Sequence, residues 1–143
     1  MINDDREPIG RYISLIHRKG KCFITKEMSK YGIGSGQIMF LIQLYKKDGL
    51  SQEELSENLN IDKGTTCRAI KKLEEEEFLI RVKDENDKRA YKLYLTEKSK
   101  AMKDNIKSLL DEWEKHISKE LSNEEVETLF SILKKICINQ NIK

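Results

Sequence analysis

The sequence of 143 residues lacks the features that mark membrane-spanning and secreted proteins. No run of about 18 apolar residues occurs, so we expect no membrane span. The N-terminus, M-I-N-D-D-R-E-P, is polar and acidic, which is not the pattern of a secretory signal. A chain of this length suits one domain of ordinary size. We therefore expect a single-domain cytoplasmic protein.

Cysteine and histidine are too scattered to predict a metal site or a disulfide scaffold. Cys22, Cys67 and Cys137 are odd in number, and no C-x-x-C pair is present. We interpret them as small buried or half-buried thiols, with a redox switch at Cys67 as the alternative. The two histidines, His17 and His116, lie far apart in the chain. We expect no metal and no cofactor.

Catalytic motifs are also lacking. The chain contains no H-E-x-x-H, G-x-S-x-G or P-loop pattern, so we expect that it is not an enzyme. Its net charge is only +2, although 36% of its residues are charged. Any surface for an acidic partner must therefore come from a local concentration of basic residues.

A helix-turn-helix is predicted immediately after residue 50. Ser51 is a good N-cap, and Glu54 three residues later completes a capping box. The short stretch 60–62 allows only a tight turn, and Asp62 can cap a second helix. In that helix the apolar stripe Thr66, Ile70 and Leu73 has the spacing of a core-facing side.

The outer face of this second helix is basic. Thr65, Arg68 and Lys72 share it at helical spacing, flanked by Lys63 and Lys71, with no acid between residues 63 and 72. Such a helix fits the DNA major groove, where Arg and Lys reach phosphates or guanine edges. The alternative is a solvated amphipathic helix on an ordinary core.

Two strands with a polar connection follow. Apolar residues alternate with polar ones around residues 80–82 and again at 93–95, which predicts a hairpin. Between them, D-E-N-D-K-R-A is longer than a tight turn needs and places Lys88 and Arg89 at the tip. A basic tip beside a helix-turn-helix is typical of a wing that enters a minor groove. Asp87 would orient Arg89 or close the loop by an Asx-type bond.

These pieces together resemble the MarR (multiple antibiotic resistance regulator) family of bacterial transcription factors. The matching residues are D-K-G-T-T-C-R at 62–68, K-L-E at 72–74, the D-x-R of Asp87 to Arg89, and L-T-E-K at 95–98. The resemblance implies a mainly α fold with a small β-hairpin wing. It also implies a homodimer with the recognition helix in the major groove and Arg89 in the minor groove.

The sequence departs from the family pattern at the wing. Glu77 stands where the family often has a Gly that ends the recognition helix, which leaves the exit of this helix open. Glu85 replaces a frequent Pro, Val82 a frequent Arg, and Ser99 a frequent Gly. Arg81, next to Val82, keeps its match.

Amphipathic helices are predicted on both sides of this lobe. A long helix runs from Ile9 to about Tyr31, with a weak spot at Gly20 where a kink is possible. Residues 36–47 are apolar on most sides and should form a buried helix, preceded by Ser35 as cap. Thr96 and Ser122 can cap two further helices with apolar stripes.

The stripes of these flanking helices need a partner. A small lobe cannot cover them, so burial against a second copy is the simplest solution. An intramolecular helical hairpin is the alternative. We therefore assign residues 35–96 to a winged helix-turn-helix DNA-binding lobe, and residues 1–34 and 97–143 to a helical dimerisation region.

The predicted function is sequence-specific binding of double-stranded DNA by a homodimer at a pseudo-palindromic operator, most simply as a ligand-responsive repressor. The alternatives are a winged-helix adaptor that binds no DNA, and a metal- or thiol-responsive regulator. The expected DNA contacts are Ser51, Gln52, Lys63, Thr65, Thr66, Arg68, Lys71, Lys72, Asp87, Lys88 and Arg89. The resemblance also implies a site for a small aromatic effector, for which the candidate wall residues are Tyr12, Ile16, Phe40, Tyr45 and Trp113.

Overall fold

The computed structural model describes residues 5–87 and 89–142, so Lys88 lies outside the described residues. The chain is mainly helical and carries one small antiparallel sheet, as predicted. In order, its elements are α1 (Ile9–Met28), the short 3₁₀ helix η1 (Ser29–Tyr31), α2 (Ser35–Lys46), β1 (Leu50–Ser51), α3 (Gln52–Leu59), α4 (Lys63–Glu75), β2 (Leu79–Lys83), β3 (Tyr91–Leu95), α5 (Glu97–Ser118) and α6 (Asn123–Asn139). None of the described helices is long and apolar enough to cross a membrane.

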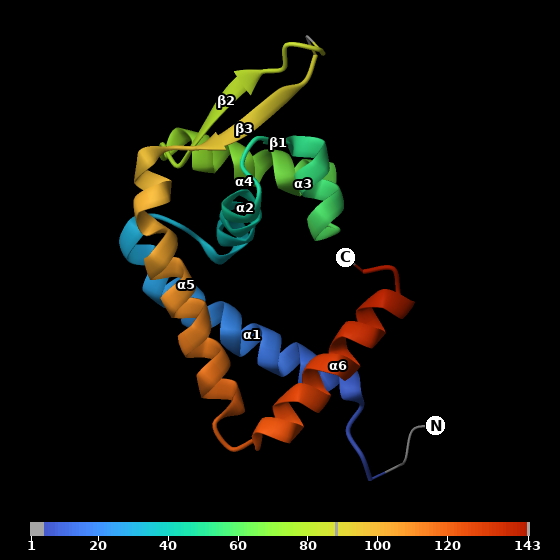
Figure 1. The fold of residues 1–143 in the computed structure, drawn as a ribbon. Helices are drawn as coiled ribbons and strands as arrows, with labels where there is room; N and C mark the ends of the chain where they lie inside the picture. The colour runs from blue at the N-terminus through green and yellow to red at the C-terminus, as the bar shows by residue number, and fades with distance from the viewer. Residues whose placement is uncertain (1–4, 88, 143) are drawn as a thin grey trace.

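The elements form a lobe and a base. Helices α2, α3 and α4 gather under the small sheet, and the β2–β3 hairpin projects from them (Figure 1). Helices α1, α5 and α6 form an open frame at the other end of the molecule (Figure 1). The long helix α5 joins the two parts, because it leaves the sheet directly after β3 and packs against α1 and α2.

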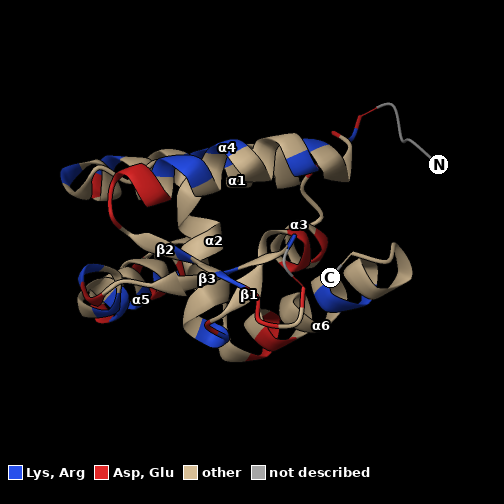
Figure 2. Ribbon diagram, turned by 90° about the horizontal axis from the view of Figure 1, so that it is seen from above, with Lys and Arg blue, Asp and Glu red and all other residues tan. Residues whose placement is uncertain are grey.

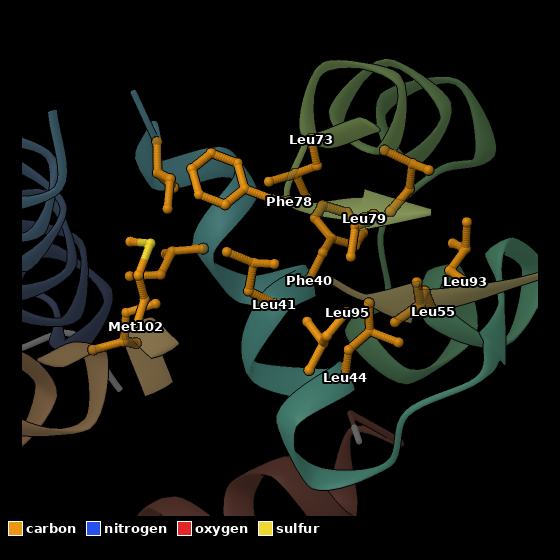
Figure 3. Packing of buried hydrophobic residues seen from close by; sticks show 14 of the residues in the cluster. Phe40, Leu41, Leu44, Leu55, Leu73, Phe78, Leu79, Leu93, Leu95 and Met102 are labelled. Atoms are coloured by element: carbon orange, nitrogen blue, oxygen red, sulfur yellow. The ribbon is translucent and has the colours of Figure 1, made fainter. Parts of the chain in front are cut away.

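One apolar core fills the lobe. Helix α2 lies at its centre, with Phe40, Leu41 and Leu44 fully buried among side chains from α3, α4 and the sheet (Figure 3). The core continues into the base through Met102 and Ile106 of α5. It therefore crosses the predicted boundary between lobe and base, which makes the top of α5 part of the lobe's foundation.

The sheet has three strands in the order β1-β3-β2, one more than the sequence predicted. The extra strand is β1, in which Leu50 pairs with Leu93. In the hairpin, Leu79 pairs with Leu95 and both face the core. The side chains of β2 alternate as predicted. However, Ile80 is 50% exposed and lies on the outer face, and it is Leu79 that packs into the core.

The predicted N-caps are present at most helix starts. Side-chain oxygens of Ser51, Asp62, Thr96 and Ser122 each accept a hydrogen bond from the backbone N–H three residues later. Ser35 is not a cap: the N-cap of α2 is Gly34, whose N–H donates to Gln37 Oε1 at 2.7 Å, while Ser35 is the first helical residue.

Helix α1 continues through Gly20 without a break. Gly20 is buried against α5, where a Cβ atom would lie 2.9 Å from the Trp113 indole. The Trp113 ring also packs against Phe23, with centroids 5.5 Å apart. The glycine thus allows α1 and the bulky indole of α5 to approach closely, and the lost helix propensity is offset by that packing.

Glu77 takes the backbone conformation that the family's glycine would supply. Its φ is +63°, in the left-handed region. The N–H of Phe78 donates to the carbonyl of Leu73 at 2.8 Å, and the N–H of Glu77 donates to the carbonyl of Glu74 at 3.0 Å. These two bonds define a Schellman motif, with Phe78 and Leu73 in the core beneath it. The exit of α4 therefore keeps its geometry despite the departure in sequence.

Candidate nucleic-acid interface

The N-terminus of α4 holds a chain of three hydrogen-bonded side chains. Asp62 caps the helix by accepting from Thr65 N at 2.8 Å and from Thr65 Oγ1 at 2.7 Å. Arg68 Nη2 in turn donates to Thr65 Oγ1 at 3.2 Å. The hydrogen bonds from the side chain and backbone of Thr65 lower the pKa of Asp62. Asp62 therefore stays ionised and fixes Thr65, which orients the Arg68 guanidinium at the exposed surface.

The basic face of α4 is exposed along its length. Lys63, Arg68, Lys71 and Lys72 all lie at the surface. Figure 2 shows blue segments along the side of the molecule where α4 and α1 overlap in this view. Thr66 differs from the expectation, because it is fully buried and its hydroxyl donates to the carbonyl of Asp62 at 3.0 Å. Its assignment as a DNA contact is wrong, and it belongs to the core-facing stripe.

The wing loop is closed by short-range hydrogen bonds. Asp87 Oδ1 accepts from the backbone N–H of Arg89 at 3.0 Å, which is the predicted Asx-type bond. The Asp87 carbonyl accepts from Ala90 N at 3.0 Å, and Asp84 Oδ1 accepts from Asn86 N at 2.9 Å. These bonds order the loop so that the exposed Arg89 side chain follows a fixed turn. Nothing is described for Lys88.

The predicted helix and wing residues meet around one groove. An open hollow of about 550 Å³ lies between the start of α3, the start of α4 and the hairpin. Of the predicted contacts it is lined by Ser51, Gln52, Lys63, Asp87 and Arg89. The first N–H groups of a helix have no partner within it and suit a phosphate oxygen, although that of Glu54 already donates to Ser51 Oγ at 3.1 Å. Basic side chains and a helix start thus converge on the same concave surface.

Arg81 is a residue of this groove that the sequence analysis did not select. It lies on β2 opposite Leu93 and lines the hollow. Its Nε atom is 3.5 Å from Glu74 Oε2, and its guanidinium carbon is 5.2 Å from the centre of the Tyr91 ring. The ion pair and the aromatic ring hold the guanidinium beside the groove. The period-2 alternation could have placed it there, because Arg81 shares a side of the strand with Leu79.

The five candidate effector residues do not surround one cavity. Phe40 is fully buried in the lobe core, so its assignment as a pocket wall is wrong. Tyr45 donates from its hydroxyl to the Ser99 carbonyl at 2.6 Å, and burial raises the pKa of Tyr45 to about 12. Trp113 packs on α1 as described above, and Tyr12 is exposed on that helix. Ile16 lines a different hollow, of about 700 Å³, between α1, α5 and α6.

No group of three or more His, Cys, Asp or Glu side chains in residues 5–87 and 89–142 is placed to hold a metal ion. All three cysteines are free thiols. Cys137 is half-buried as expected, but Cys22 and Cys67 are exposed, which corrects the expectation for those two. Cys67 is exposed because it lies on α4 next to the buried Thr66, one step off the packing stripe.

The base carries many exposed apolar side chains, which we call the base stripe. Its residues come from the first half of α1 and from α6, and each is exposed: Ile9, Tyr12, Ile13, Leu15, Ile16, Leu129, Phe130, Ile132, Leu133, Ile136 and Ile138. Helix α6 buries none of its residues, and Phe130 is 61% exposed. An exposed apolar surface of this size is typical of a site that another surface covers.

A helix-turn-helix with a basic outer helix, followed by a hairpin whose basic side chains face the same groove, defines a DNA-binding transcription regulator of the winged-helix class. The sequence model of the MarR family matches residues 33–91, which span α2 to the start of β3. Together with the relatives described next, this match shows that the chain belongs to the MarR family.

Relatives match over almost the whole chain. The HTH-type transcriptional regulator BilQ of Clostridium symbiosum is 34% identical over 87% of this chain and 87% of its own length. A MarR transcriptional regulator from Methanosarcina mazei Go1 is 41% identical, with a TM-score of 0.88, 92% of this chain covered and 95% of that one. A MarR family regulator from Listeria monocytogenes, solved with 26mer DNA, is 28% identical, with a TM-score of 0.88, 94% of this chain covered and 89% of that one.

Proposed function

We propose that the protein binds a pseudo-palindromic operator in double-stranded DNA as a homodimer. The observation that carries the proposal is the convergence of Lys63, Arg81 and Arg89 with the start of α3 around one groove. In this arrangement α4 enters the major groove, and Arg89 at the wing reaches the adjacent minor groove. The Listeria structure solved with DNA supports this proposal because its fold matches 94% of the present chain with a TM-score of 0.88.

The base stripe supports the homodimer. Stripes on α1 and α6 are left uncovered within one chain, and a two-fold partner would cover both with the same residues. Two recognition helices held about 34–36 Å apart would then meet successive major grooves on one side of the DNA. Two equivalent helices require two equivalent half-sites, which is why the operator is expected to be pseudo-palindromic.

Repression, and its relief by a small aromatic molecule, are further proposals that rest on the family resemblance. A ligand could act only by favouring one spacing of the two recognition helices over another. Benzoate and related aromatic acids, added to the protein bound to its selected DNA, test this directly. A shift in affinity is expected if such a site exists, and unchanged affinity across the series would contradict it.

The DNA-binding proposal is tested by selecting duplexes from a random library with the full-length chain and titrating the selected site at two salt concentrations. We expect affinity that falls as salt rises, because phosphate contacts release counterions. Arg89→Ala should weaken binding by roughly 1–3 kcal/mol while leaving the dimer intact. Arg6→Ala, an exposed arginine outside the helices, is the matched control. Binding that is neither sequence-specific nor salt-dependent would instead favour the adaptor that binds no DNA.

A further inference from the structure

The first turn of α5 holds the end of α4 through three side chains. Lys98 Nζ donates to the carbonyl of Glu76 at 2.9 Å, and Thr96 Oγ1 donates to the carbonyl of Glu77 at 2.7 Å. Ser99 Oγ donates to the carbonyl of Phe78. Three consecutive carbonyls at the exit of the recognition helix are thus bound by Thr96, Lys98 and Ser99, which we call the α5 clamp.

Additional contacts make this corner rigid. The Lys98 ammonium lies 4.2 Å from the centre of the Phe78 ring, beneath which the core begins. A cation at this place also complements the negative end of the α4 dipole. On the other side of the turn, Tyr45 of α2 donates to the carbonyl of Ser99 at 2.6 Å. The first turn of α5 is therefore held by the recognition helix and by the central helix of the lobe at once.

The clamp lies at the opposite end of α4 from the groove. Helix α4 has 13 residues, so its exit is about 20 Å from Asp62 and the groove. From the clamp, α5 runs uninterrupted for 22 residues into the base (Figure 1). The direction in which α5 leaves the end of α4 consequently fixes the direction of the recognition helix relative to the base stripe.

We propose that Thr96, Lys98 and Ser99 are positioning residues that hold α4 at one angle to α5, and so set the half-site spacing that a dimer accepts. This inference rests on the proposed function, because spacing has meaning only for a DNA-binding dimer. The clamp does not touch DNA. It acts by making a change in spacing costly, since the two recognition helices cannot turn independently of the base.

The test uses the full-length chain and its selected operator. Affinity is measured for the selected site, for the same site with one base pair inserted or deleted at its centre, and for a single half-site. Lys98→Met removes the ammonium and keeps an unbranched stem. Lys100→Met is the matched control, because Lys100 lies on the same turn of α5 and pairs only with Glu97, at 3.4 Å, in the described chain. Lys98→Arg tests rescue by a donor that keeps the charge.

Wild type and Lys100→Met should lose affinity about tenfold when the spacing changes by one base pair. Lys98→Met should lose affinity about three- to tenfold on the selected site, and its penalty for altered spacing should shrink at least threefold. Its affinity for the half-site should stay unchanged, and Lys98→Arg should restore the spacing penalty. These results would support the positioning role.

Two results would overturn it while leaving the proposed function intact. A Lys98→Met protein with the wild-type spacing penalty would show that the clamp does not set the angle. A uniform loss on all sites, the half-site included, would show that Lys98 only supports the fold of α4. If wild type selects no DNA, the proposed function fails and the positioning role fails with it.

Discussion

The lobe and the base use apolar side chains in opposite ways. Helix α2 in the lobe buries Phe40, Leu41 and Leu44, and its neighbours complete the core within one chain. Helix α6 in the base also carries an apolar stripe and buries none of it. The core of the lobe is therefore complete within one chain, whereas the exposed apolar side chains of the base are buried only when another surface covers them. The apolar side chains of the lobe therefore serve the folding of one chain, whereas those of the base stripe are available for assembly with another surface.

The largest change in stability is expected when a side chain is removed from the lobe core. Phe40→Ala should lower the free energy of unfolding by about 3–5 kcal/mol, because it leaves a cavity where the surroundings are packed on all sides. Urea denaturation followed by circular dichroism measures the change. Met39→Ala, the exposed neighbour on the same helix, is the control and should cost much less.

A charge in the base stripe should affect assembly instead. Phe130→Asp should raise the dissociation constant of the proposed dimer on the order of a hundredfold, or about 3 kcal/mol, because a carboxylate would be buried without a partner. Sedimentation at several protein concentrations measures it. Ser131→Asp introduces the same charge on the side of α6 opposite Leu129 and Leu133 and should leave assembly unchanged. Equal effects of the two variants would mean that the stripe is not the interface.

Within the base, the contact between α1 and α5 differs from the base stripe, because it is packed within one chain. Gly20→Ala should lower the free energy of unfolding by about 1–3 kcal/mol, because the new methyl group would meet the Trp113 indole at 2.9 Å. Gly10→Ala on the same helix has nothing within 4 Å and should be neutral or slightly stabilising. Thermal unfolding compares them, and a stabilised Gly20→Ala protein would show that the indole moves aside easily.

The smallest expected effect is a gain of stability at the border between the lobe and α5. Glu77→Gly should raise the free energy of unfolding by about 0.5–1 kcal/mol, because glycine adopts the observed left-handed φ without steric cost. Glu76→Gly is the control: its φ is −84°, so the change should destabilise the protein. If both variants lose stability, the left-handed exit of α4 carries no measurable strain.

Sequence patterns are sufficient for the helices, the hairpin and part of the groove. Helical caps at Ser51, Asp62, Thr96 and Ser122 are local chemistry, and local chemistry is visible along the chain. The Asx-type bond at Asp87 was predicted for the same reason. The basic face of α4 followed from helical spacing, which places the same residues together in the sequence and in the structure.

The missed features depend on contacts between distant parts of the chain. Gly20 looked like a weakness because its partner, Trp113, is remote in sequence. The strand β1 is only two residues long, too short for any periodicity, and it exists because β3 pairs with it. Thr66 was assigned both to the core stripe and to the DNA contacts, and only the packing of α4 decides between them.

Strand β1 also bears on which length changes this fold can tolerate. Ser51 pairs with Lys92 as part of β1 and at the same time caps α3. Deleting one residue between positions 49 and 52 would turn the buried Leu50 to the outside and remove the cap, because strand faces alternate with every residue. Insertions at 84–86 would lengthen the surface loop ahead of the D-x-R of Asp87 to Arg89. Variation in length among related chains should therefore accumulate in this loop, where it changes the reach of the hairpin, while β1 beneath it keeps a constant length.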